Sequence, residues 1–303
     1  MLDLQSDPVD AALQIVHLSC SPTTISGDPY FLECDMKKHL HIIEPGTKVN
    51  LADYDPDNTG HYKGKVQADA KLDAHRKRLL ELQELLYAED KRALLVVLQG
   101  MDGAGKDGTI RHIFTGVNPQ GCQVTSFKVP SEEESQHDFL WRVHKAAPRR
   151  GMIGIFNRSH YEEVLVVRVH QKLSPQALER RFDDINNFEH ELADNHTHIL
   201  KFFLHISKDE QKKRLQARLD HPRKYWKVSP GDIAERQYWD DYIKAYEDAL
   251  SHCSTKYAPW YIVPANHKWY RNVAISEVLL DVMESFKMKY PKPKLDIKKI
   301  RVK

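Results

Sequence analysis

The sequence of 303 residues lacks several features that would place it in a class at once. Its four cysteines form no C-x-x-C pair, so neither a disulfide scaffold nor a zinc site is indicated. No apolar run reaches the roughly 18 residues that span a bilayer, and the N-terminus has no signal-peptide pattern. The net charge is only +2, which does not demand a nucleic acid as partner. We therefore expect a cytoplasmic protein that binds neither membrane nor nucleic acid.

The two ends of the chain differ from its middle. Residues 1–65 contain five prolines and a turn-rich close, so we expect an extension packed on the main domain. His39 and His41 have the spacing of a metal pair, but no third ligand is evident nearby, and solvated histidines of a short strand or loop are the favoured interpretation. The Lys-rich residues 291–303 are expected to form a loose surface tail.

Short apolar runs alternate with helical stretches over residues 66–290, which we take as one domain. Strand alternating with helix indicates right-handed βαβ crossovers and a parallel sheet covered on both faces. We predict an α/β three-layer sandwich with a five-stranded parallel sheet. The expected strands are 94–99, 122–127, 152–156, 199–206 and 260–263, and the expected helices are 67–89, 105–115, 131–146, 175–193, 208–219, 233–252 and 270–288.

The first apolar run is followed by Gly100–Thr109, which reads GMDGAGKDGT and fits the phosphate-loop pattern G-x-x-x-x-G-K. Glycines let several backbone N–H groups point inward, and the next helix presents its positive end to the same place. Lys106 adds a point charge for terminal phosphates. The fold is therefore expected to be P-loop kinase-like. The predicted phosphate-binding residues of this loop are Gly103, Ala104, Gly105, Lys106, Asp107 and Gly108.

Two aspartates make the loop unusually acidic. Asp107 replaces the Ser or Thr whose hydroxyl usually reaches Mg²⁺, and Asp102 lies inside the loop. Carboxylates beside a polyanion would repel it unless a cation lay between them, so we infer bound Mg²⁺, with Mn²⁺ as a substitute and Asp102 as the stronger ligand candidate. An alternative for Asp107 is a first-turn residue favoured by the helix dipole.

The run at 152–156 ends in a polar segment. Ligands of open α/β sheets bind at the carboxyl ends of the strands, so Asn157, Arg158 and Glu162 are expected to face the loop and bind the nucleotide. Arg158 is suited to a bidentate phosphate clamp, and Glu162 to a metal. Because Asn157 stands where such motifs usually have Asp, the metal carboxylate must come from elsewhere. A polar loop that caps the next helix is the alternative.

Residues 209–232 are predicted to form a basic helical lid. Between Lys212 and Lys227 there are seven basic residues and Asp220 is the only acid, and Arg214 and Arg218 share a helix face. In P-loop kinases a basic segment after the fourth strand commonly closes over phosphates, whereas the alternative is a solvated charged helix. The lid residues expected to contact phosphate are Arg214, Arg218, Arg223 and Lys224.

These motifs resemble those of the polyphosphate kinase 2 family. Leu98–Ile110 is similar to its phosphate loop, Phe156–Val164 to its second motif, and the lid and Tyr257–Tyr261 to further family segments. The form Asn-Arg-Ser-His-Tyr-Glu resembles the class III branch, whereas another branch has Asp and Trp in place of Asn157 and His160. The resemblance covers roughly residues 60–290, in consistent order and spacing.

The resemblance implies inorganic polyphosphate as donor, Mg²⁺, and ADP and AMP as acceptors, with GDP and GMP as further candidates and a homo-oligomer as the assembly. We predict a polyphosphate:nucleotide phosphotransferase that works by direct in-line transfer, in which catalysis is positioning and charge neutralisation. The predicted catalytic residues are Lys106, Asp102, Arg158, Arg214 and Arg218, and the predicted metal ligands are Asp102 and Glu162.

Two other functions stay open at the level of sequence. An ATP-dependent nucleotide or small-molecule kinase of thymidylate-kinase type would share the loop and the lid, although Asp107 and Asn157 break its usual metal arrangement. A non-catalytic polyanion-binding protein would use the same basic segments with a steep salt dependence.

Overall fold

The computed structural model describes residues 40–171 and 173–302. Its centre is one six-stranded sheet with the strand order β1-β6-β5-β2-β4-β3. Five of the strands run parallel and correspond to the five predicted apolar runs. These strands are β2 (Ala93–Gln99), β3 (Cys122–Ser126), β4 (Ile153–Asn157), β5 (Thr197–His205) and β6 (Trp260–Pro264).

The prediction of five strands was wrong by one. β1 (His41–Ile43) joins the sheet at its edge and runs antiparallel to β6, with Ile43 opposite Trp260. Three residues are too few to show an alternating pattern in the sequence, and β1 is held by a partner more than 200 residues away. Ile43 is buried, so part of the segment before residue 65 contributes to the core.

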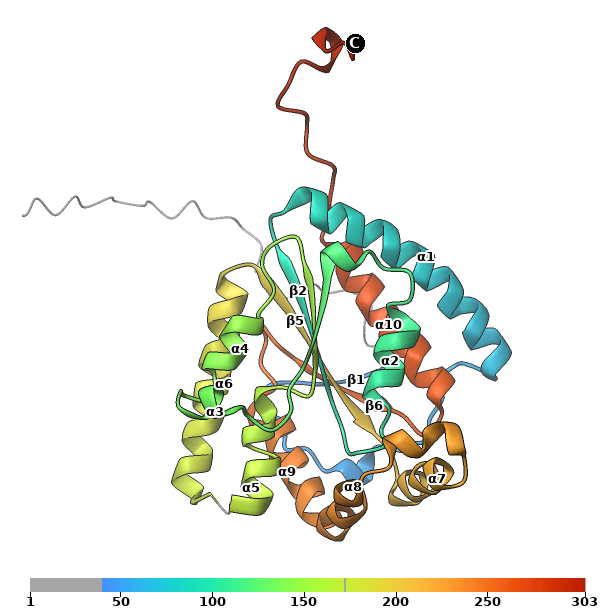
Figure 1. Cartoon of the computed structure of the whole chain (residues 1–303), viewed down its shortest axis with the longest axis vertical. Helices are drawn as coiled ribbons and strands as arrows, with labels where there is room; N and C mark the ends of the chain where they lie inside the picture. The colour runs from blue at the N-terminus through green and yellow to red at the C-terminus, as the bar shows by residue number, and fades with distance from the viewer. Residues whose placement is uncertain (1–39, 172, 303) are drawn as a thin grey trace, which may run out of the picture.

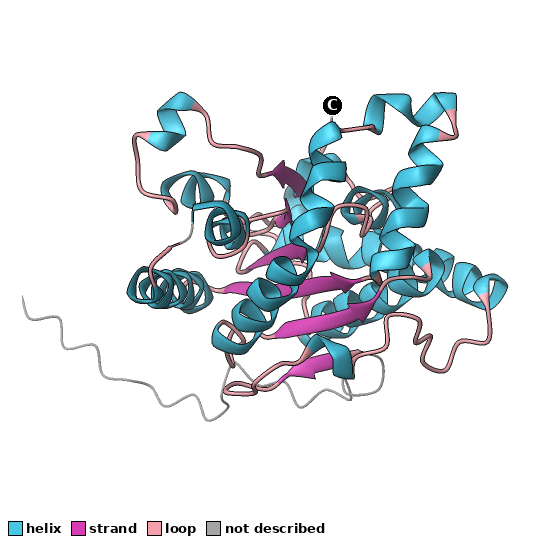
Figure 2. Cartoon of the chain, turned by 90° about the horizontal axis from the view of Figure 1, so that it is seen from below, coloured by secondary structure: helices cyan, strands magenta, loops and turns pink. Residues whose placement is uncertain are grey.

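Helices cover both faces of the sheet and complete the predicted three-layer α/β sandwich (Figure 1). α1 (Lys65–Glu89), α2 (Lys106–Ile113) and α10 (Lys268–Ser285) lie on one face. α4 (Trp141–Ala146) and α6 (Pro175–Asp194) lie on the other. Figure 2 shows the strands as one twisted layer between these helices.

Several helix boundaries differ from the predicted ones. The stretch 131–146 is divided into α3 (Glu132–Ser135) and α4, because the Asp138 carboxylate accepts hydrogen bonds from the backbone N–H groups of Leu140 and Trp141, at 3.0 and 3.1 Å, and so starts a new turn. The stretch 233–252 is regular α-helix only over α9 (Trp239–His252). α5 (Val166–Gln171) is a helix that was not predicted from the sequence.

Six short 3₁₀ segments and one further short helix are also present in the described residues. Those outside the site are η2 (Leu51–Asp53), η3 (Pro119–Gly121) and η7 (Ile297–Lys299), and those at the site are η4 (His160–Glu163), η5 (Pro222–Lys227), η6 (Glu235–Tyr238) and α8 (Pro230–Ala234).

The lid region lies at the carboxyl ends of the parallel strands. α7 (Lys208–Leu219) follows β5 and is joined through η5 to α8, and Figure 1 shows α7 and α8 together at the lower end of the molecule. At the opposite end the chain beyond α10 projects from the body, and residues 289–297 of this tail are exposed.

Some predictions concern residues outside the described part of the chain, among them His39, Cys20 and Cys34. His41 lies in β1 with its ring edge-on to Tyr54, at a centroid distance of 5.2 Å. No group of three or more His, Cys, Asp or Glu side chains within residues 40–171 and 173–302 is arranged to hold a metal. In the same ranges no helix is long and apolar enough to cross a membrane.

Sheet order brings the predicted motifs to one place. β2 lies between β4 and β5, and Leu98 of β2 is paired with Asn157 of β4. The phosphate loop after β2, the second motif after β4 and the lid after β5 therefore leave the sheet side by side. This is the arrangement expected for ligand sites of open α/β sheets.

Candidate active site

The phosphate loop connects β2 to α2, as predicted, and its backbone requires glycine. Gly103 has φ 83° and Gly105 has φ 101°, values that favour glycine over residues with a side chain. A Cβ atom added at Gly105 would also lie 2.2 Å from Nη1 of Arg271. Glycine is therefore needed at position 105 both for the backbone angle and for close packing.

Side chains from other elements hold the carbonyl groups of this loop. Gln211 of α7 donates to the Asp102 carbonyl at 2.8 Å, and Arg214 donates to the carbonyls of Gly103 and Ala104 at 3.0 and 2.9 Å. Holding the carbonyls fixes the peptide planes. The loop N–H groups are thereby preorganised for an anion.

Lys106 is buried at the start of α2, and its ammonium donates to the Gly100 carbonyl at 2.6 Å. Burial and the nearby positive charge of Arg158 lower the pKa of Lys106 to about 8, although Asp102 and Glu162 act in the opposite direction. A terminal phosphate placed here would add further negative charge and so favour the charged ammonium.

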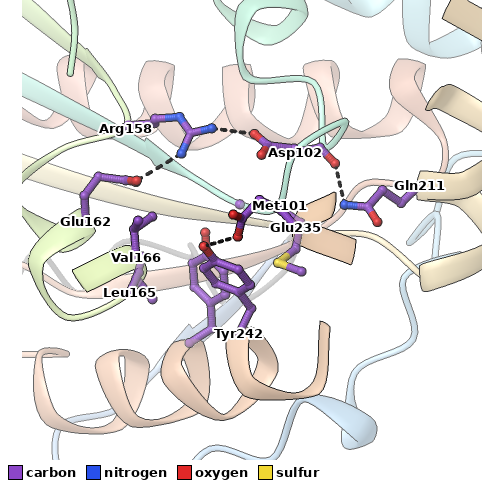
Figure 3. Close-up of a pocket in the computed structure, with 11 residues that line it drawn as sticks. Met101, Asp102, Arg158, Glu162, Leu165, Val166, Gln211, Glu235 and Tyr242 are labelled. Carbon is purple, nitrogen blue, oxygen red and sulfur yellow. Dashed lines mark hydrogen bonds and ion pairs between the residues drawn. The ribbon is translucent and has the colours of Figure 1, made fainter. Parts of the chain in front are cut away.

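Arg158 joins the two predicted metal ligands (Figure 3). Its guanidinium donates to the Asp102 carboxylate at 2.5 Å and to the Glu162 carboxylate at 2.9 Å. Burial lowers the pKa of Arg158, but the carboxylates of Glu162 and Asp102 outweigh it and raise the pKa above its ordinary value. Arg158 also has a φ of 62°, a strained value for a residue with a side chain.

The structure thus brings together six of the predicted residues at the mouth of the loop. Asn157 ends β4 beside the first turn of α2, where its side-chain amide meets the Asp107 carboxylate. These residues are Asp102, Lys106, Asp107, Asn157 and Arg158, together with Glu162 of η4.

The four predicted lid residues are placed differently from one another. Arg214 is buried, with its guanidinium on backbone carbonyls and on the Glu210 carboxylate at 2.7 Å. Arg218 pairs with Asp232 of α8 at 2.7 Å. Arg223 and Lys224 in η5 are exposed, and neither pairs with a described carboxylate. Direct phosphate contact by these four residues stays a prediction.

Two acids just outside the stretch from Lys212 to Lys227 change the charge balance expected for the lid. Glu210 and Asp232 neutralise Arg214 and Arg218. Helical i,i+4 spacing joins Glu210 to Arg214 and would have revealed the first pair. The exposed cations of η5 are the ones that fit a lid for phosphate.

A buried ionic network beneath the second motif was missed. Glu189 of α6 accepts hydrogen bonds from Tyr161 at 2.9 Å and from Lys201 of β5 at 2.5 Å, and its carboxylate lies 3.1 Å from Nε2 of His160. The side chains of Lys201 and Glu189 are fully buried. Because His160 and Tyr161 directly precede Glu162, the network fixes the segment that carries this carboxylate.

A small pocket lies between the loop and α9. Figure 3 shows Tyr242 donating to Glu235, at 2.8 Å, on the side opposite Arg158, and Tyr246 of α9 also lines the pocket. These aromatic residues follow ordinary helical spacing, which in the sequence is indistinguishable from a core stripe.

A larger cavity of about 600 Å³ opens on the other side of the second motif. Its lining includes Phe139, which stacks with Arg181 at 4.3 Å from the ring centroid, and Glu163, which pairs with Arg181 at 3.2 Å. The cavity lies where the predicted helix 131–146 is interrupted between α3 and α4, so this interruption helps to form the cavity.

The fold and the site together define a P-loop phosphotransferase. Phosphoryl transfer uses three features that are present here. They are the parallel sheet, the glycine-dependent phosphate loop with its buried lysine, and the arginine that is hydrogen-bonded to two carboxylates at the strand ends. The comparisons with known proteins make the class more specific.

The sequence profile of the polyphosphate kinase 2 family matches residues 62–291. The chain is 52% identical over 266 residues to the AMP/ADP-polyphosphate phosphotransferase of Meiothermus ruber, across 88% of this chain and 99% of that protein. It is 49% identical to the ADP-polyphosphate phosphotransferase of Rhodopseudomonas palustris, across 82% and 90% of the two chains. The protein belongs to the polyphosphate kinase 2 family.

A solved structure agrees with this assignment. The crystal structure of polyphosphate kinase 2 from Arthrobacter aurescens TC1 is similar with a TM-score of 0.82 and 48% identity, over 84% of this chain and 92% of that one. The predicted family and fold class are confirmed, and the thymidylate-kinase type is not favoured.

Proposed function

We propose that this protein is a polyphosphate-dependent nucleotide kinase that transfers the terminal phosphate of inorganic polyphosphate to ADP and AMP, with GDP and GMP as further acceptors. The observation that carries the proposal is the similarity to the AMP/ADP-polyphosphate phosphotransferase of Meiothermus ruber. The alignment covers 99% of that protein at 52% identity, and that protein is named for this activity. The preorganised loop and its buried lysine supply a place for the donor end.

Transfer requires little covalent chemistry from the protein. A terminal phosphate oxygen of the acceptor attacks the last phosphorus of the chain, and the bond from that phosphorus to its bridging oxygen breaks. The attacking oxygen is ionised near neutral pH, so no strong general base is needed. Lys106 and the loop N–H groups hold the transferring phosphate, and Arg158 neutralises charge that develops beside it.

The residues at the loop mouth fit Mg²⁺, or Mn²⁺ in its place. Mg²⁺ sites of phosphotransferases use one or two carboxylates together with substrate phosphates, and Asp102 and Glu162 present two carboxylates to the same guanidinium. These two residues would hold the ion, which when bound supplies charge neutralisation for the phosphates. Until then Arg158 holds the two carboxylates close to one another through its hydrogen bonds.

The acceptor nucleoside is proposed to enter the cavity of about 600 Å³ beside the second motif. Glu163 lines this cavity and directly follows Glu162, and Phe139 contributes an aromatic ring to the lining. The entry of both adenine and guanine nucleotides into this cavity is part of the proposal.

The protein is also proposed to act in the cytoplasm, where nucleoside mono- and diphosphates are abundant, and as a homo-oligomer. Sedimentation velocity of the purified chain at several concentrations tests the assembly. A single species with the mass of one 35.2 kDa chain at all concentrations would contradict it.

The proposed activity is tested by incubating AMP, ADP, GMP and GDP in parallel with polyphosphate and Mg²⁺ in the absence of ATP. Chromatography is expected to show ATP from ADP, and ADP followed by ATP from AMP. A parallel reaction with the Lys106→Ala variant excludes a contaminating kinase. Product formed only when ATP is supplied as donor would instead support the thymidylate-kinase type.

A further inference from the structure

Arg271 lies near the start of α10, directly behind the phosphate loop. Its side chain is among the largest fully buried ones in the described chain, with 2% of the residue exposed. Its Nη1 donates to the Ala104 carbonyl at 2.9 Å, and its Nη2 donates to the Asn272 side-chain oxygen at 2.9 Å. Arg271 belongs to none of the sequence motifs, and it has no role yet in the active site.

The guanidinium of Arg271 packs against the first turn of α2. A Cβ atom at Gly105 would lie 2.2 Å from its Nη1, and one at Gly108 would lie 3.5 Å from its Nη2. The N-terminal end of a helix carries partial positive charge. Arg271 therefore adds a full positive charge behind the point where Lys106 and this helix end already present positive charge to a ligand.

The charge of Arg271 has no acidic counterpart in the described residues. Its two partners, the Ala104 carbonyl and the Asn272 amide oxygen, are neutral. The neighbouring Arg214 has Glu210 as its partner. Burial and the charge of Arg214 lower the pKa of Arg271 to about 9. An unpaired buried charge is unfavourable, so the charge of Arg271 lowers the folding stability of the free enzyme.

Hydrogen bonding alone does not explain why an arginine is present. The Ala104 carbonyl already accepts a hydrogen bond from Arg214 at 2.9 Å, so the loop backbone would keep a partner without Arg271. A neutral side chain of similar length could fill the same space. Arg271 supplies positive charge behind the loop, and a neutral residue would not.

We propose that Arg271 is a positioning residue whose unpaired buried charge is neutralised by the bound polyphosphate, so that it promotes donor binding through the loop without touching the donor. The inference rests on the proposed placement of the donor end at the phosphate loop. Within a poorly solvated region, charges interact strongly over the thickness of one backbone segment. The charge thus stabilises the loaded enzyme and destabilises the free one.

The proposal predicts opposite effects on stability and on donor binding. Arg271→Met removes the charge and keeps most of the apolar volume, whereas Arg271→Lys keeps a charge. The Met variant is expected to bind polyphosphate at least about tenfold more weakly while the free protein melts at the same temperature as wild type or higher. The Lys variant is expected to recover much of the binding.

The experiment measures the dissociation constant of polyphosphate by titration calorimetry, and the melting temperature with and without polyphosphate, for wild type and both variants. Arg180→Met, at an exposed position of α6, is the matched control for loss of one positive charge and is expected to leave both quantities unchanged. KM for polyphosphate should rise in the Met variant more than kcat falls.

Two results would overturn the inference. Wild-type affinity in Arg271→Met would show that the charge is not used. A lowered melting temperature of the free Met variant, with no recovery of binding by Lys, would show a purely structural residue. If wild type itself fails to bind polyphosphate, the proposed function fails instead, and the two failures are thereby distinguished.

Discussion

The side-chain amide of Asn157 donates a hydrogen bond of 2.6 Å to the carboxylate of Asp107. This contact joins the end of β4 to the first turn of α2. It links the two positions at which the sequence departs from an ordinary P-loop pattern, because Asp107 replaces a hydroxyl residue and Asn157 replaces an acid. A carboxylate at both positions would place two negative charges side by side, whereas the amide and the carboxylate are complementary.

Asn157→Asp is therefore expected to lower kcat/KM by roughly tenfold to hundredfold, because hydrogen bonds to charged groups contribute about 1.5–3 kcal/mol. The exchanged double variant Asp107→Asn with Asn157→Asp restores one amide and one carboxylate. It should recover activity to within a few-fold of wild type in the polyphosphate assay. A double variant as poor as the single one would show that the pairing is not what the site requires.

Lys106→Ala and Asp102→Ala are each expected to reduce turnover by about 10²–10³-fold, in the range seen when one charge-stabilising group is removed. Lys71→Ala, at an exposed position of α1, serves as the control and should retain full activity. Circular dichroism should show that all three variants are folded. Nearly unchanged turnover in either site variant would remove the basis for its assignment.

Polyphosphate binding is expected to weaken as the pH rises through about 8. The pKa of Lys106 in the free enzyme is lowered to about 8, first by burial and then by Arg158. The ammonium that attracts the polyanion is present below this pKa and is lost above it, so KM for polyphosphate should rise at higher pH.

KM measured from pH 6.5 to 9.5 checks the sign of this pH dependence. A KM that falls with rising pH, or stays flat over the whole range, would contradict the assigned role of the buried lysine.

The buried network at Glu189 is expected to stabilise the folded protein and to fix the position of the second motif. Lys201→Met leaves Glu189 without its cation, and removing one partner of a buried ion pair typically destabilises by about 3–5 kcal/mol. The double variant Lys201→Met with Glu189→Gln should be less destabilised than the sum of the two single variants. Urea unfolding followed by fluorescence measures all three, and single variants within about 1 kcal/mol of wild type would contradict the prediction.

The parallel core of the fold was accessible from the sequence because its strands are continuous apolar runs. Every residue of β2 is buried, and a run apolar on both faces is the pattern of a central parallel strand. β1 was missed because its three residues are defined by pairing with β6 rather than by their own pattern. The interruption within 131–146 depends on a single side-chain cap by Asp138, which propensity does not reveal.

The loop and the second motif could be predicted because their residues are contiguous and follow strands. Their supports could not, since Gln211, Arg271 and Lys201 come from distant elements and become partners only through the sheet order. In the sequence, Lys201 is a charged residue inside an apolar run, which is a visible signal of a buried ion pair. Arg214 illustrates the reverse case, because its basic character indicated phosphate while the structure places it on the loop backbone.

The central claim is that the phosphate loop holds the polyphosphate donor and leaves the nucleotide to the opposite side of the site. Titration calorimetry of wild type and Lys106→Ala with polyphosphate and, separately, with ADP tests it most directly. The account predicts that the variant loses most of its affinity for polyphosphate and keeps its affinity for ADP within about twofold. Loss of ADP binding with polyphosphate binding unchanged would contradict it and would place the nucleotide on the loop.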